Sequence, residues 1–193
     1  MSLSLLAHNA GCAGSDRPWF PDREEVELLL RISLFSQDDE RALRSAWRIL
    51  QGQTDDYLDV VLGVVAAYPL LANALRGADG GDGSESGSET IRRHFQRWLS
   101  ETCNLPKDPP WLRQLYSKPP AQDAPANGES AETLPQFRYL IALVYPVVAT
   151  VRPFLAAAGC SAVEVEKMQY ALLKAILLQV ALLAKLYLET GNW

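Results

Sequence analysis

Residues 138–155 read RYLIALVYPVVATVRPFL, and this stretch decides the fold class. Its apolar side chains recur every three or four residues, which is the spacing of one face of an α-helix. The residues on that face are Leu140, Leu143, Val144, Val147 and Val151. Pro146 and Pro153 interrupt the stretch, and a proline removes an amide donor and clashes with the preceding turn. We therefore expect a long helix over residues 136–158 that bends near both prolines.

Gly159 stands just beyond the helix of residues 136–158, where a glycine is expected to stop it, and a second long helix follows. Ser161 and Glu164 form a capping box, S-A-V-E, that predicts a helix start, and the apolar pattern continues to about Glu189. Toward the N-terminus, helical periodicity predicts helices over residues 22–31, 54–68 and 89–102. A further helix is predicted to begin at Ser36, whose side chain can cap it by accepting from the amide near Asp39. No stretch alternates with the period of a strand. The sequence thus predicts an all-α domain over residues 20–193, preceded by a flexible tail over 1–19.

Two segments are predicted to lie outside the helices. Residues 77–88 (GADGGDGSESGS) form a low-complexity loop, and residues 104–135 contain seven of the twelve prolines of the chain. Within the second segment only a short helical piece, near residues 111–116, is expected.

Composition and charge exclude several classes of function. The chain has 193 residues, a formal net charge of −5 and no dense run of Lys and Arg, so a nucleic-acid-binding surface is not expected. Lys174, Gln179 and Lys185 interrupt the apolar run at residues 171–188, so we expect no membrane span. Three widely spaced cysteines form neither a disulfide framework nor a zinc site, which favours a reducing, cytoplasmic location. Known catalytic motifs are absent from the sequence, so we expect no enzyme.

Several stretches resemble the protoglobin family, the single-domain members of the globin-sensor group. Residues 138–155 are one, and residues 163–170 (VEVEKMQY), leading into 178–183 (LQVALL), are another. Residues 94–104 and 35–41 add to them in the family's order. The resemblance implies an extended globin fold with an extra N-terminal helix. It also implies haem, the binding of oxygen, carbon monoxide or nitric oxide, and a close helix crossing at Gly63.

The sequence departs from that family at the haem site. The family's proximal histidine should follow a motif like residues 111–113, but residues 115–125 (LYSKPPAQDAP) contain no histidine. A shortened, proline-rich loop is thus expected in place of the proximal helix. On the distal side, Val61 and Leu62 replace a Trp-Tyr pair, whereas Phe95 matches the family's distal phenylalanine. We interpret these three residues as a vestigial distal pocket.

Two functions stay open. The first is a haem-independent globin that acts through protein contacts or an apolar ligand. The second is a haem-binding carrier or sensor of oxygen, carbon monoxide or nitric oxide with an axial ligand other than the usual histidine. The candidate ligands for this second function are Tyr116, Lys118, Cys103 and His94.

The resemblance also implies a homodimer built by the last two helices. Their apolar content predicts an interface that includes Leu140, Val144, Leu173 and Leu177. A separate signalling partner would have to relay any sensing.

Overall fold

The computed structural model describes residues 21–68, 85–108, 110–112 and 137–190. The helices in these ranges are α1 (Arg23–Ile32), α2 (Gln37–Leu50), α3 (Thr54–Ala66), α5 (Glu85–Asn104), α7 (Phe137–Thr150), α8 (Arg152–Ala157) and α9 (Ala162–Thr190). No strand occurs in the part of the chain that the structure describes, so the all-α prediction is confirmed. The predicted tail over 1–19 and the predicted loop over 115–125 lie outside the described residues.

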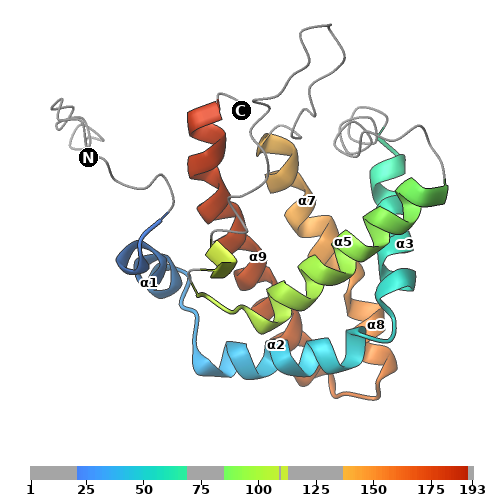
Figure 1. Ribbon diagram of the computed structural model, residues 1–193. Coiled ribbons are helices and arrows are strands. Elements are labelled where there is room, and N and C mark those ends of the chain that lie inside the picture. The colour runs from blue at the N-terminus through green and yellow to red at the C-terminus, as the bar shows by residue number, and fades with distance from the viewer. Residues whose placement is uncertain (1–20, 69–84, 109, 113–136, 191–193) are drawn as a thin grey trace, which may run out of the picture.

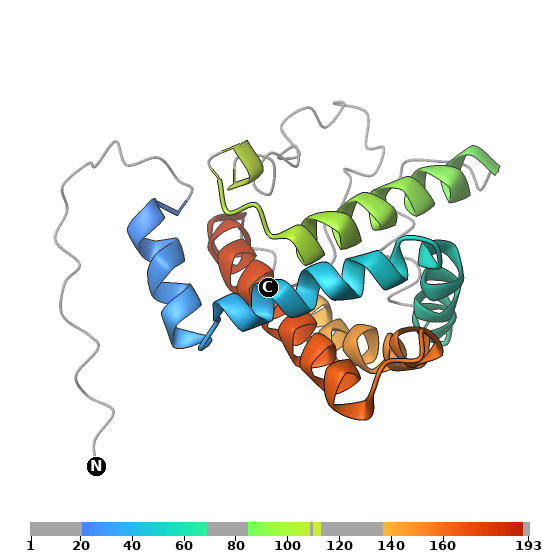
Figure 2. The same ribbon diagram turned by 90° about the horizontal axis from the view of Figure 1, so that it is seen from below.

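The long helix α9 organises the packing (Figures 1 and 2). It contacts α1, α2, α5, α7 and α8, while α3 packs against α5 and α7. Leu172 and Ala175 of α9 are fully buried, as are Leu43, Ala46 and Leu50 of α2. These side chains form the centre of one continuous hydrophobic core.

Both predicted capping residues begin helices. Ser36 accepts from the Asp39 amide at 3.3 Å and its own amide donates to Asp39 at 2.8 Å, which closes a capping box at α2. Ser161 and Glu164 form the same pair at α9. Gly159, predicted as a helix stop, has φ +77°, a conformation that glycine adopts without the steric cost of a side chain.

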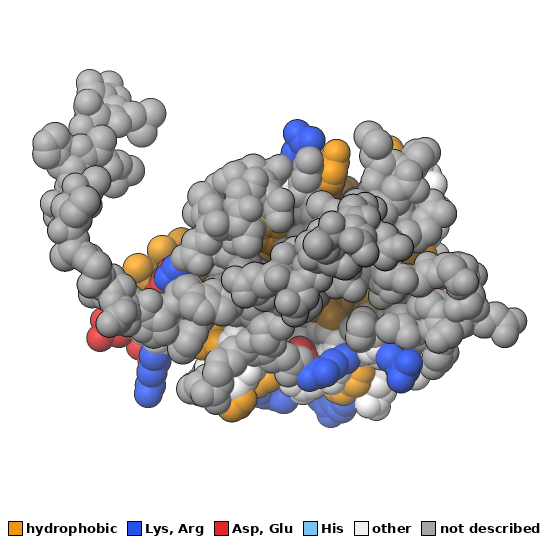
Figure 3. All heavy atoms as spheres, turned by 45° about the horizontal axis from the view of Figure 1, so that its top comes forward, with side chains coloured by type: hydrophobic (Ala, Val, Ile, Leu, Met, Phe, Trp, Pro, Cys, Tyr) orange, Lys and Arg blue, Asp and Glu red, His pale blue; other side chains and the backbone are white. Residues whose placement is uncertain are grey.

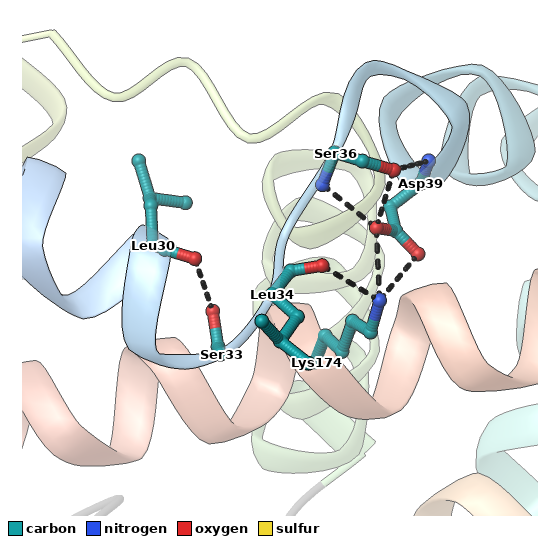
Figure 4. A network of polar contacts seen from close by, with 6 residues as sticks. All are labelled: Leu30, Ser33, Leu34, Ser36, Asp39 and Lys174. Carbon is teal, nitrogen blue, oxygen red and sulfur yellow. Dashed lines mark hydrogen bonds and ion pairs between the residues drawn. The ribbon is translucent and has the colours of Figure 1, made fainter.

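A partly buried ion pair fixes the turn between α1 and α2 on α9 (Figure 4). The Lys174 ammonium donates to both carboxylate oxygens of Asp39 and to the Leu34 carbonyl, each at 3.0 Å. Burial acts to raise the pKa of Asp39, but hydrogen bonds from Lys174 and Ser36 outweigh it and hold the pKa below its ordinary value. Asp39 therefore stays charged and links α2 to α9.

The long bent helix of residues 136–158 is two helices, separated at Val151. Pro146 lies inside α7, whereas Pro153 stands in the first turn of α8, where its missing amide hydrogen is tolerated. Carbonyls near the break accept from side chains: Tyr57 donates to Val147 at 2.6 Å and Gln169 to Val148 at 2.9 Å. Side chains of α3 and α9 therefore bond backbone carbonyls next to the break.

Two other expectations were wrong. Helix α5 begins at Glu85, so the predicted loop over 77–88 ends earlier than its Gly and Ser content indicated. Gly63 makes no close helix crossing, because a Cβ atom built on it meets nothing within 4 Å. Gly63 lies on the exposed side of α3.

Candidate functional site

The residues predicted to line the distal pocket lie on α3 and α5, which pack against each other. Phe95 and Val61 are half-buried and contact the core, while Leu62 is half-buried beside Val61 in sequence. The Phe95 ring lies 5.4 Å from the Tyr57 ring and 5.5 Å from the Trp98 ring, measured between centroids. Phe95 therefore packs toward the interior, between α3 and the neighbouring turn of α5.

Tyr57 is the central residue of this region, and sequence reasoning missed it. Its side chain is fully buried, and its ring packs at a tilt against Phe95 and, with centroids 5.4 Å apart, against Phe154 of α8. Its hydroxyl donates to the Val147 carbonyl at 2.6 Å, and burial raises its pKa far above the ordinary value. We call Tyr57, Phe95, Trp98 and Phe154 the aromatic cluster.

A signal for Tyr57 did exist in the sequence. Tyr57, Val61 and Val65 are spaced four residues apart on α3, so they share one helix face. Val65 is 4% exposed and Tyr57 is not exposed at all. The polar tip of a tyrosine on an otherwise apolar face indicates a buried hydroxyl that needs a partner.

A buried polar triad extends from the aromatic cluster to α9. The Trp98 indole nitrogen donates to Gln179 Oε1 at 3.1 Å, and Gln179 Nε2 donates to the Thr102 hydroxyl at 2.8 Å. The Thr102 hydroxyl in turn donates to the Trp98 carbonyl at 2.7 Å. Because buried polar groups are stable only when paired, the triad of Trp98, Thr102 and Gln179 fixes α5 on α9.

Comparison with protein families gives a match to the protoglobin family over residues 22–117. This match identifies residues 22–117 as a protoglobin domain. It covers α1 to α5 and ends inside the stretch 115–125, which lacks the expected histidine. A search of curated proteins finds no match to the chain.

A protoglobin holds haem, so the side chains present must be tested for an iron ligand. The aromatic cluster and Val61 are apolar, and the Tyr57 hydroxyl is already bonded to the Val147 carbonyl. Cys103 is buried and desolvation raises the pKa of its thiol to about 12, so it supplies no thiolate. The described residues contain no group of three or more His, Cys, Asp or Glu that could hold a metal ion. Tyr116, Lys118 and the His94 side chain lie outside the described residues. The described residues of the predicted pocket therefore supply no ligand for haem iron.

Two cavities of this protoglobin domain lie away from the predicted pocket. One, of about 570 Å³, lies between α2 and the end of α5, and its lining includes Trp47 and Asn104. The other, of about 480 Å³, lies between α1 and Lys107–Leu112. Neither is lined by Val61, Leu62 or Phe95.

The predicted dimer residues differ in their exposure. The prediction of Val144 as an interface residue is wrong, since it is 7% exposed and belongs to the core of the single chain. Leu140 and Leu173 are half-buried, and Leu177 is 45% exposed. Other large apolar side chains of these helices reach the surface, namely Ile141, Tyr145, Val163 and Tyr170. Figure 3 shows hydrophobic side chains reaching the surface among basic ones on one face of the molecule.

The last helices also meet a test for membrane spans. Residues 137–157 and 162–185 are long and apolar enough to cross a bilayer. Lys174 and Lys185, on which the expectation of no membrane span was based, do not lower the hydropathy of the second of these segments below that of a span. The core helix of a soluble protein has the same length and composition. In α9, Lys174 and Gln179 bond to other helices of the same chain, as expected of a core helix.

Proposed function

We propose that this protoglobin domain works without haem, through protein contacts or through an apolar ligand. The observation that carries the proposal is the placement of histidine. The chain has only His8 and His94, so the region after α5, where the family's proximal ligand is expected, has none. Without an iron–nitrogen bond, haem is held by apolar contacts alone.

The described contacts support this proposal. Among them, the hydroxyl of Tyr57 serves the α7–α8 break, and the Phe95 ring packs on Tyr57 and Trp98. These interactions hold α3, α5 and α8 together through side chains of the protein itself. A cofactor is not needed to join these three helices.

The alternative function is a haem-binding carrier or sensor with another axial ligand. Cys103 is unsuitable as that ligand because its thiol is buried and stays protonated. Tyr116, Lys118 and His94 remain its candidate ligands, and tyrosinate is a known haem ligand.

Haemin titration distinguishes the two functions. Purified protein mixed with an equal concentration of haemin is expected to show no sharp Soret band after gel filtration. A histidine-ligated globin passed over the same column is the positive control. A stable Soret band would overturn the haem-independent proposal, and its loss in Tyr116→Phe or His94→Ala would identify the ligand.

We further propose a homodimer through α7 and α9, in a reducing cytoplasm. Val163, Tyr170 and Leu177 are 59%, 57% and 45% exposed at seven-residue intervals, so they share one side of α9. Ile141 and Tyr145 are exposed one turn apart on α7, which packs against α9. Such apolar side chains are typical of an interface core. Cys103 and Cys160 are free thiols, which suits the proposed compartment.

The dimer is tested by substituting two of its exposed residues. Tyr145→Glu together with Leu177→Glu should convert a dimer to a monomer in light scattering coupled to size exclusion, because each carboxylate would be buried at the interface. The matched control is Leu28→Glu with Tyr68→Glu, which changes the same residue types on α1 and after α3. A monomeric wild-type protein, or a dimer that survives the first pair, would contradict the proposed face.

A further inference from the structure

The outer face of α2 carries three arginines above a cavity. Arg41, Arg44 and Arg48 are spaced three and four residues apart, so their side chains share one helix face. With Ser45, Trp47 and Asn104 they line a cavity of about 570 Å³. The lining residues belong to α2 and to the last turn of α5. These two helices pack side by side (Figure 2).

These arginines are incompletely neutralised by the protein. Arg41 pairs with Asp38 at 2.9 Å, but Arg44 lies 3.7 Å from Glu40, whose other oxygen binds Lys107 at 2.6 Å. Arg48 donates to the neutral hydroxyl of Ser45 at 3.1 Å. The six residues that line the cavity include no carboxylate. A positive surface therefore stands on a chain whose net charge is −5.

The spacing of the arginines favours a ligand with several separated negative charges. From residue 41 to residue 48 the helix rises about 10 Å, at ~1.5 Å per residue. A single phosphate group is too small to span this row. Alternate side chains of an extended peptide lie ~6.6 Å apart, which is close to the ~6 Å rise between residues 44 and 48.

The row is also accessible and has an apolar neighbour. The side chains of Arg41 and Arg44 are 68% and 54% exposed, so an incoming chain meets them directly. Half-buried Trp47 lines the same cavity and offers an apolar surface. Arginine and tryptophan are the residue types that contribute most at protein interfaces.

We propose that this arginine face binds an extended acidic segment of a partner protein, with carboxylates at alternate positions and an apolar side chain beside Trp47. The face is separate from the aromatic cluster. The inference therefore stands or falls independently of whether the domain binds haem.

Fluorescence anisotropy of labelled peptides on the full-length protein tests the proposal. A fluorescein-labelled peptide that alternates glutamate with leucine should bind, and one that alternates glutamine with leucine should not. Binding should weaken as salt rises, since exposed charge pairs are screened. Arg48→Glu should weaken binding by about tenfold, because it replaces attraction by repulsion at the row.

Arg31→Glu is the matched control. Arg31 and Arg48 both stand in the last turn of their helices, so both substitutions remove the same favourable interaction with the helix dipole. Only Arg48 lines the cavity, so Arg31→Glu should leave peptide affinity unchanged. Arg44→Gln, a milder change, should also weaken binding and covers the case in which Arg48→Glu does not fold.

Four results would overturn the proposal. They are a failure of the glutamate peptide to bind, equal binding of the glutamine peptide, equal losses in Arg31→Glu and Arg48→Glu, and full displacement of the peptide by an equal concentration of inorganic phosphate. The last of these would indicate a small-anion site instead of a peptide site.

Discussion

Tyr57→Ala is expected to lower the free energy of unfolding by about 3–5 kcal/mol, the range for removing a large buried aromatic side chain. Tyr57 is completely buried, and its ring contacts Phe95 on α5 and Phe154 on α8. Its removal leaves a cavity where three helices meet and takes a donor from the Val147 carbonyl. Urea unfolding followed by circular dichroism measures the loss.

Tyr57→Phe separates the ring from the hydroxyl. This variant keeps both ring contacts, and the Val147 carbonyl keeps a hydrogen bond from Thr150 at 3.1 Å. A loss of only about 1 kcal/mol is therefore expected, the typical value of one hydrogen bond. Equal losses in the two variants would show that the hydroxyl, and not ring packing, holds these helices together.

The features that could be predicted from the sequence are those that depend on residues close together in the chain. The capping residues Ser36 and Ser161 and the stop at Gly159 act within one turn of the chain, so their patterns are visible in the sequence. Phe95 could be placed because the family resemblance fixes its helix face. The start of α5 at Glu85 was missed, because the Gly and Ser content of residues 77–88 is typical of a loop.

The remaining features depend on partners far away in the chain. Tyr57 donates to the Val147 carbonyl next to the break at Val151. Cys103 is excluded as a haem ligand only because it is buried. Val144 has the same apolar pattern as a surface residue of a dimer, yet its side chain faces the core. Periodicity identifies an apolar face but does not say whether the same chain or a partner covers it.

Gln179 is a second residue whose role only the packed structure shows. It is 5% exposed on α9, and its side-chain amide both accepts from Trp98 and donates to Thr102. Gln179→Leu leaves the part-buried Trp98 indole N–H without its acceptor. A loss of about 1–2 kcal/mol is expected in urea unfolding, since an unsatisfied buried polar group costs about 1–3 kcal/mol and partial contact with water lowers that cost.

A double-mutant cycle with Thr102→Val tests whether the triad acts as one unit. Valine keeps the shape of threonine but removes the hydroxyl that bonds both Gln179 and the Trp98 carbonyl. When residue 102 is already valine, Gln179→Leu removes one hydrogen bond fewer than it does in the wild-type protein. The loss in the double variant should therefore be smaller than the sum of the two single losses by about 1 kcal/mol. Losses that simply add would mean that Gln179 and Thr102 stabilise α5 on α9 independently, and that the short contact between them contributes nothing to the free energy of unfolding.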